Sequence, residues 1–243
     1  MFFDTRYLYI ALVIIVLISI FSGGFSILNL LLTIPGVLIA ITFHEFAHAF
    51  TAYKLGDDTP KYQGRLSLNP FSHLDPFGVI MLIFAHIGWG KPVEINPNNF
   101  TRKLSPRAAE AIVAFAGPLM NFILSFVFAI IFYALKTFAP NFAIGTQVGM
   151  IIMTMLQYTV IVNVGLGVFN LIPLPPLDGS KVLMAFLSYN AKRWFEEHTP
   201  IFYIIFLVIW ITPISSMIIS PAIGAITGGI DGIVGGLFGM FAS

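Results

Sequence analysis

The sequence predicts an all-α integral membrane protein with about six transmembrane helices and a small membrane-associated β element between the second and third spans. The first observation is compositional: 58% of the 243 residues are hydrophobic and only 9% are charged, with a mean hydropathy of +0.92. An ordinary soluble domain carries about 25% charged residues. The second observation is a series of apolar runs close to the roughly 20 residues that a helix needs to cross a bilayer.

Six apolar runs are the candidate spans, at residues 7–21, 27–53, 108–135, 148–172, 201–219 and 222–241. The first is short enough for a signal peptide, but one basic residue precedes it and no convincing small-residue cleavage site follows. The last carries glycines every four residues from Gly224 to Gly236, a spacing that favours close helix packing, so it is a sixth span or a re-entrant helix. We therefore expect one membrane domain over 1–243, with a first span in 1–26, a core of three spans in 27–185 and C-terminal spans in 186–243.

The basic residues indicate the orientation. With a cytoplasmic N-terminus, every lysine and arginine except Lys136 lies on the cytoplasmic side, as the positive-inside rule favours. This predicts a multi-pass protein of the cell membrane with an external 136–147 connection and a cytoplasmic 54–107 loop. The net charge of +1, without a basic cluster, gives no sign of nucleic-acid binding.

The stretch TFHEFAHAF, residues 42–50, places ionisable side chains inside the second span. His44 and His48 are four residues apart and share a helix face, so both can bind one tetrahedral Zn²⁺, while Glu45 projects about a quarter-turn away. The chain has no cysteine, which leaves histidines and acids as metal ligands. Two histidines satisfied by hydrogen bonds inside the bundle are the alternative, but ionisable groups within a membrane are costly and indicate function.

A third ligand is expected from NLIPLPPLDGSKVL, residues 170–183. Its three prolines must unwind the fourth span, and non-helical backbone at membrane depth is buried in protein or lines a cavity. Asp178 follows the prolines on the same side as the histidines, so it is the candidate ligand; alternatively, it caps a short helix from about 179 to 189. A hydrolytic zinc site keeps a fourth position for water, and Glu45 would then act as the general base.

Two segments of the long cytoplasmic loop, 64–69 and 91–96, alternate polar and apolar residues. They predict a small sheet whose free edge accepts an extended peptide, although an ordinary hairpin explains the pattern equally well. The apolar piece between them is too short to span and is expected to be re-entrant. His73 and His86 in this loop, and His198 in a later charged loop, are not expected to be ligands.

These motifs resemble those of the site-2 protease family of intramembrane zinc metalloproteases. HEFAHAF in a span, followed by NLIPLPPLDG, carries the resemblance, and LNPFSHLDPFG, GWGKPVEINP and GPLMN extend it over residues 34 to 185. The resemblance implies hydrolysis of a peptide bond within or beside the membrane, in a transmembrane substrate. It also implies one zinc ion per chain and these roles: His44, His48 and Asp178 as ligands, Glu45 as base, and Asn170 or, as second choice, Asn121 as oxyanion donor.

Two other classes of protein remain open at this stage. A metal or solute transporter would also place histidines and an aspartate in a membrane, but it favours ligands on several spans and internal repeats, which the sequence lacks. An inactive scaffold that binds membrane segments would not need Glu45 beside the histidines. The expected partners are a transmembrane protein substrate, the lipid bilayer and, because no accessory domain is recognisable, a regulatory membrane partner.

Overall fold

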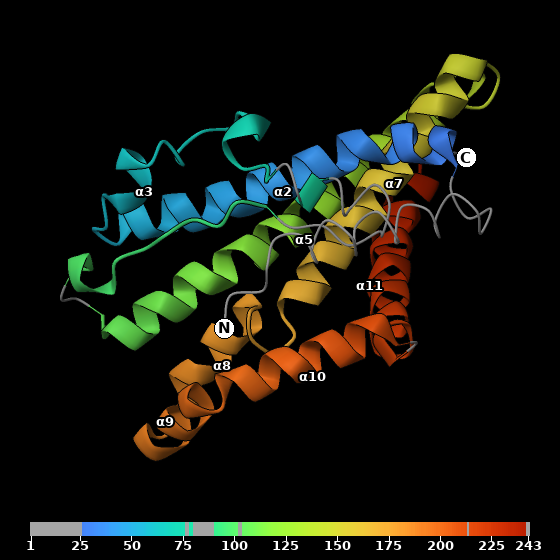
Figure 1. The fold of residues 1–243 in the computed structure, drawn as a ribbon. Helices are drawn as coiled ribbons and strands as arrows, with labels where there is room; N and C mark the ends of the chain where they lie inside the picture. Colours follow the sequence, from blue (N-terminus) through green and yellow to red (C-terminus); the bar gives the residue numbers. More distant parts are fainter. Residues whose placement is uncertain (1–25, 76–77, 80–89, 102–103, 213, 242–243) are drawn as a thin grey trace.

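The computed structural model describes residues 26–75, 78–79, 90–101, 104–212 and 214–241, and these residues are nearly all helical (Figure 1). The helices are α2 (Ile27–Lys54), α3 (Thr59–Tyr62), α5 (Pro106–Phe138), α6 (Pro140–Ala143), α7 (Gln147–Asn170), α8 (Asp178–Phe186), α9 (Tyr189–Glu197), α10 (Thr199–Ile211) and α11 (Ile214–Gly239), with 3-10 turns η1 (Pro70–Ser72) and η2 (Pro97–Asn99). Four segments are long and apolar enough to cross a membrane: Ile27–Lys54, Pro106–Phe138, Gln147–Asn170 and Ser216–Gly239. The predicted first span at 7–21 lies outside the described residues.

The long helices begin at capping side chains. Ser26, Ser105 and Thr146 each accept a hydrogen bond from the backbone amide three residues later, which satisfies an amide that the helix itself leaves unpaired. α7 ends at Asn170, just before the proline-rich turn, as the sequence predicts.

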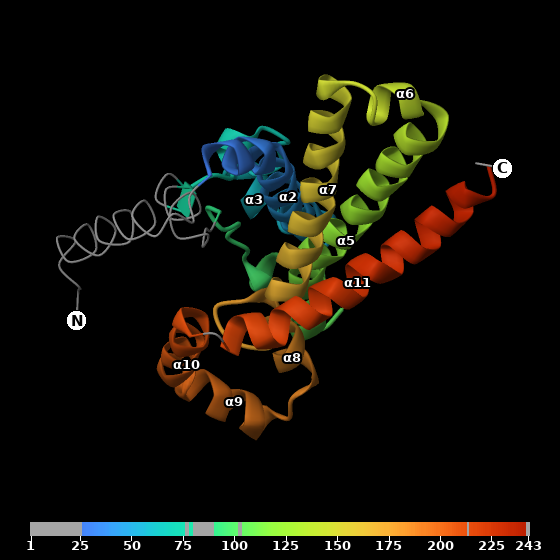
Figure 2. The same cartoon turned by 90° about the vertical axis from the view of Figure 1, so that its right-hand side faces the viewer.

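Three helices, α2, α5 and α7, pack against one another and form the centre of the molecule, and α11 packs on α5 and α7. Figure 2 shows α5 and α7 antiparallel and joined through α6, with α8, α9 and α10 grouped at the opposite end. The side chains buried between α5, α7 and α11 are small or branched and apolar: Ala129, Val160, Val164, Ile230 and Val234. Large apolar side chains remain exposed on the outer faces, as expected for helices surrounded by lipid.

The predicted fifth span, 201–219, is wrong as a single helix. α10 ends at Ile211, and its 13 residues extend only about 20 Å, less than the roughly 30 Å thickness of a bilayer core. Thr212 has φ −108° and ψ 162°, the extended conformation favoured before a proline, and the sequence has proline at 213. The apolar run is therefore divided, and its second half joins the predicted glycine-rich span in α11. Six spans are not confirmed.

The predicted β element is not confirmed either. Within the described residues the only pairing of extended backbone is an isolated bridge between Leu74 and Gly90. Residues 91–96 form neither a helix nor a strand. Their amides bond elsewhere: that of Val93 donates to Glu45 and that of Asn96 to Asp57. The Val93 and Asn96 amides, which a sheet would pair with a neighbouring strand, are therefore bonded to carboxylate side chains.

Candidate metal centre

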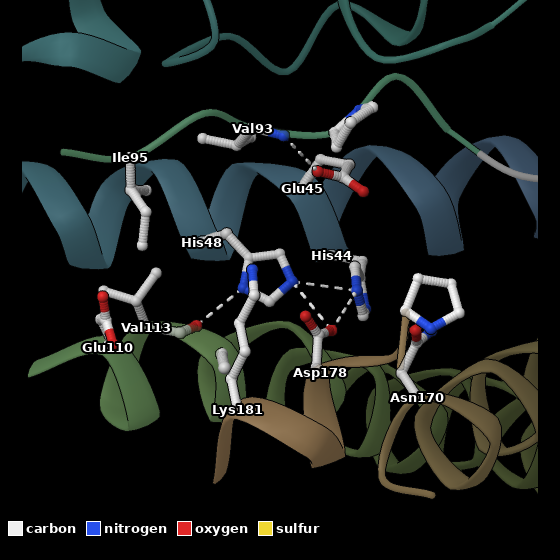
Figure 3. A pocket seen from close by; sticks show the side chains of 13 residues that line it. His44, Glu45, His48, Val93, Ile95, Glu110, Val113, Asn170, Asp178 and Lys181 are labelled. Atoms are coloured by element: carbon white, nitrogen blue, oxygen red, sulfur yellow. Dashed lines mark hydrogen bonds and ion pairs between the residues drawn. The ribbon is translucent and has the colours of Figure 1, made fainter. Parts of the chain in front are cut away.

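Three side chains from distant parts of the chain converge between α2 and α8 (Figure 3). Nε2 of His44 lies 3.0 Å from Nε2 of His48, and each nitrogen lies 3.1 Å from Oδ2 of Asp178. In a tetrahedral zinc site, with bonds of about 2.0–2.2 Å, neighbouring ligand atoms are separated by about 3.3 Å. The three atoms therefore form a triangle close to one face of a zinc tetrahedron.

The hydrogen bonds behind the histidines determine which ring nitrogens carry protons. Nδ1 of His48 lies 2.7 Å from the backbone oxygen of Val113, which can only accept, so this nitrogen carries hydrogen. Nδ1 of His44 lies 2.6 Å from Oδ1 of Asn121 and likewise donates. In neutral rings both Nε2 atoms then present lone pairs to each other and to a carboxylate oxygen. Three electron-pair donors about 3 Å apart, without a proton to share, fit a bound cation.

Asn121 is held in this orientation by two other helices. Its amide nitrogen donates to the backbone oxygen of Ala40 at 3.1 Å and to Oδ1 of Asn163 at 3.0 Å. The backbone oxygen can only accept, so the Asn121 oxygen must face His44. Asn163 in turn donates to the backbone oxygen of Thr159 at 2.8 Å. Asn121 and Asn163 are fully buried, and together they connect α7 through α5 to the His44 ring.

Gly117 on α5 leaves room for the rings of His44 and His48, which extend from α2. A Cβ atom at this position would collide with Nε2 of His48 and would lie 2.7 Å from Cε1 of His44. Only glycine lets the backbone of α5 approach the rings this closely.

Asp178 is the first residue of α8, and its side chain does not cap that helix. The turn after α7 brings it back to α2, where its carboxylate faces both histidines. The next residue, Gly179, packs against the backbone oxygens of Leu171 and Ile172, so the start of α8 is fixed against the turn. The sequence-based alternative of a capping aspartate therefore does not describe this side chain.

Glu45 lies beside the same centre but faces a different segment. Its Oε2 accepts a hydrogen bond from the amide of Val93 at 3.2 Å. A cavity of about 160 Å³ adjoins both the glutamate and the cluster, and it is lined by His44, Glu45, His48, Pro92, Val93, Ile95, Glu110, Val113, Ala114, Asn170, Pro176, Asp178 and Lys181. A hydrolytic centre needs such a space for a water and a carbonyl group beside the metal and the base.

The two asparagines singled out from the sequence differ in placement. Asn170 lines the cavity, and its amide donates one bond, to the backbone oxygen of Leu166 at 3.0 Å. Asn121 has already committed both amide hydrogens, to Ala40 and Asn163, so it has none for an oxyanion. Its observed position is behind His44, as a group that orients the ring.

The two other histidines in the described part of the chain, His73 and His198, do not belong to the cluster. His73 is fully buried and bonds the backbone oxygen of Ser67 at 2.6 Å, while His198 bonds that of Trp194. His86 lies outside the described residues. Sequence reasoning missed Asn163, Gly117 and the Val93 amide; Gly117, within GPLMN, was the one that a search for small residues facing the His helix could have found.

Comparison with known proteins gives independent evidence of the family to which the chain belongs. The sequence model of peptidase family M50 matches residues 32–212. A Bacillus subtilis (strain 168) relative, provisionally named zinc metalloprotease YwhC, is 35% identical over 189 residues, covering 78% of this chain and 84% of the relative. A Mycolicibacterium smegmatis relative, provisionally named zinc metalloprotease Rip2, is 31% identical, covering 75% and 68%. No solved structure gives a significant match.

The family match covers most of the chain and includes both the helix that carries the histidines and the turn that carries the aspartate. Four helices are long and apolar enough to cross a membrane, and the cluster of His44, His48 and Asp178 is suited to one zinc ion. The chain therefore belongs to peptidase family M50, and it is a multi-pass intramembrane zinc metalloprotease.

Proposed function

We propose that the protein hydrolyses peptide bonds in or next to transmembrane segments, with His44, His48 and Asp178 as zinc ligands and Glu45 as general base. The observation that carries the assignment is the convergence of two imidazole nitrogens and a carboxylate oxygen within 3.1 Å of one another. When bound, zinc supplies a Lewis acid that polarises a carbonyl oxygen and makes water nucleophilic at neutral pH.

Glu45 has the geometry of a base held in place. One carboxylate oxygen accepts the Val93 amide, and the other makes no hydrogen bond with a described residue, so it is available to accept a proton from water. The same carboxylic acid can then deliver that proton to the leaving amine. The HExxH arrangement thus separates two functions on one helix, with metal binding on the His44 and His48 face and proton transfer at Glu45.

Asn170 is the proposed donor to the oxyanion that forms as water adds to the carbonyl. It borders the same cavity as Glu45, and only one of its two amide hydrogens is used by a described residue. Asn121 is not retained in this role because both its amide hydrogens are committed.

A substrate must unwind before its peptide bond can reach the centre, because a helical peptide bond is hydrogen-bonded and shielded. The segment 91–100, called the strap below, contacts Glu45 through the Val93 amide, and its Pro92, Val93 and Ile95 line the cavity. We assign the strap as the surface along which the unwound substrate lies, in the manner of an added strand. Cleavage takes place near the cytoplasmic face of the cell membrane, and a further membrane protein regulates access.

The first test uses purified protein in detergent, with three variants measured together: wild type, Glu45→Gln, and Glu196→Gln as a matched control on exposed α9. Zinc content and cleavage of a panel of transmembrane segments are measured for each. We expect one zinc per chain in all three and loss of cleavage, by at least about 10³-fold, only in Glu45→Gln.

Other outcomes would assign the protein differently. Zinc retention with no cleavage by any form would favour an inactive binding scaffold. Zinc binding with undiminished cleavage in Glu45→Gln would remove Glu45 as the base. Absence of bound metal in the wild type would remove the ligand assignment itself.

A further inference from the structure

Asp57 is a buried carboxylate outside the metal centre, three residues beyond the end of α2. The residue is 0% exposed. Its Oδ1 accepts hydrogen bonds from the backbone amide and the hydroxyl of Thr59, at 3.0 and 2.5 Å, and from the side-chain amide of Asn99 at 2.9 Å. Its Oδ2 accepts the backbone amide of Asn96 at 2.6 Å. Burial of a charge is costly unless hydrogen bonds replace the lost water, and four donors do so at Asp57.

Asp57 holds the strap. The Asn96 side chain accepts from the amide of Asn98, which folds η2 into a turn that presents the Asn96 amide and the Asn99 side chain together. The Asn96 amide and the Asn99 side chain therefore bond the two oxygens of one carboxylate. Charge-assisted bonds of this kind are roughly twice as strong as neutral ones, so this end of the strap is firmly fixed.

The backbone next to Asp57 is shaped for the same contact. Gly56 has φ 106°, a conformation that glycine adopts without strain. A Cβ atom there would lie 2.8 Å from the Thr101 side chain, and the Thr101 amide donates to the backbone oxygen of Leu55 at 2.8 Å. The end of α2 and the end of the strap thus touch through backbone as well as through Asp57.

The strap is also held at other points of the described structure. Phe100 is buried in an apolar cluster with Ala52, Ala109 and Val113, Ile95 packs against that cluster, and Gln63 makes an exposed bond with Glu94. The Lys91 amide donates to the backbone oxygen of His73 at 2.7 Å, and the Val93 amide donates to Glu45 at 3.2 Å. Val93 and Asn96 are only three positions apart in the sequence. Movement at the Asp57 end would therefore be transmitted to the amide that holds Glu45 and to Val93 and Ile95, which line the cavity.

We propose that Asp57 is a positioning residue of the protease: by anchoring Asn96 and Asn99 it sets the strap against Glu45 and shapes the surface that receives the extended substrate. The inference rests on the proposed roles of Glu45 and the strap. Burial alone would raise the pKa of Asp57, but hydrogen bonds from Thr59, Asn96 and Asn99 outweigh it and lower this pKa, so the anchor is charged at neutral pH.

The neighbouring residue provides a matched control. Asp58 is exposed and makes no side-chain hydrogen bond with a described residue, so Asp58→Asn removes the same charge one position away. Asp57→Asn turns one acceptor into a donor facing existing donors and releases part of the strap. For each variant the measurements are zinc content, kcat and KM on a transmembrane-segment substrate, and hydrogen exchange of amides 91–100.

We expect Asp57→Asn to keep one zinc per chain, to raise KM, to lower kcat/KM about 10- to 100-fold, and to exchange strap amides faster. Asp58→Asn should match the wild type in every measurement. A purely structural role predicts another pattern, in which zinc content and apparent kcat fall together while KM stays constant, because the folded molecules would remain normal. The double variant Asp57→Asn/Asn99→Asp restores a donor–acceptor pair and should recover part of the loss.

Unchanged kcat/KM in Asp57→Asn, or faster strap exchange without a kinetic effect, would overturn the inference. If Asp57→Asn does not fold, Asn99→Ala removes one anchoring bond and should give a smaller change of the same pattern. Measurement of Glu45→Gln alongside these variants distinguishes failure of the proposed chemistry from failure of the positioning role. A fully active Glu45→Gln rejects the proposed chemistry, whereas an inactive Glu45→Gln beside an unaffected Asp57→Asn rejects only the positioning role.

Discussion

Oδ1 of Asn121 accepts a 2.6 Å hydrogen bond from Nδ1 of His44, and this contact determines which face of the imidazole carries a lone pair. The bond joins α5 to α2 at a position where neither residue is exposed by more than 5%. Groups that bind the far nitrogen of a metal-ligating histidine fix its tautomer and its ring orientation. An asparagine inside the bundle thus shapes the centre without facing the cavity.

Asn121→Leu should therefore weaken zinc binding. We expect the zinc dissociation constant to rise about 10- to 100-fold, as for loss of other groups that orient metal-ligating histidines. Competition with a chelator measures the constant, with Asn141→Leu on α6 as an exposed control. Asn163→Leu should have a smaller effect, because it removes only the support of Asn121. Unaltered zinc affinity in Asn121→Leu would contradict the orienting role.

Gly117→Ala should disrupt the centre by steric overlap. The added methyl group would occupy the space of the His48 ring and approach His44 at 2.7 Å, so the rings must leave their common position or α5 must move away. We expect loss of stoichiometric zinc in the purified variant. Gly232→Ala on α11 is the matched control, because a Cβ there has no neighbour within 4 Å. Full zinc content in Gly117→Ala would show that this close approach is not required.

Asn170→Ala separates catalysis from metal binding. Removal of one oxyanion donor lowers kcat by about 10²- to 10³-fold in hydrolytic enzymes, and we expect a loss of that size with zinc content unchanged. KM should change little, because the donor acts on charge that develops in the transition state. The exposed residue Asn190 on α9 gives the control Asn190→Ala. A large rise in KM with normal kcat would instead make Asn170 a substrate-binding group.

The lowered pKa of Asp57 predicts how the strap responds to pH. A carboxylate whose folded-state pKa lies below its unfolded value of about 3.9 stabilises the fold above that value and loses its contribution as pH falls through the folded pKa. Protection of amides 91–100, corrected for intrinsic exchange, should therefore stay constant from pH 8 to 5 and decline only below about pH 4. Asp57→Asn should lack this transition, and Glu94→Gln tests the carboxylate within the strap itself. A decline already between pH 7 and 5 would implicate a different group.

The sequence alone was sufficient to predict that His44, His48 and Asp178 converge. A four-residue spacing on an apolar helix and three prolines before an aspartate are local signals, and the orientation of the spans places both at one membrane face. The same hydropathy signal failed at α10 and α11 because apolarity continues beyond Ile211, whereas the backbone of Thr212 is not helical. Hydropathy measures composition, and the helix end depends on a single proline.

The remaining differences between prediction and structure arise from tertiary contacts. Alternation in 91–96 predicted a strand, but Glu45 and Asp57, which accept hydrogen bonds from the Val93 and Asn96 amides, are distant in sequence, so no local pattern could reveal that a sheet would not form. Asn163 is similar: an asparagine within an apolar helix has many potential partners, and only the packing of α7 on α5 selects Asn121. Local chemistry predicted the candidate ligands, while the groups that orient them depend on how the helices pack.

The absence of cysteine makes the predicted topology directly measurable, because any introduced cysteine is the only thiol in the chain. Ile144 lies in the short connection between α6 and α7 and is 67% exposed, whereas Tyr62, at the end of α3, is 84% exposed on the predicted cytoplasmic side. In intact cells a membrane-impermeant maleimide should label Ile144→Cys and should leave Tyr62→Cys unlabelled until the membrane is opened. The positive-inside rule gives this direction, since Lys136 is the only basic residue predicted outside. The reverse labelling pattern would place the metal centre at the opposite face, and substrates would then be cut from that side of the membrane.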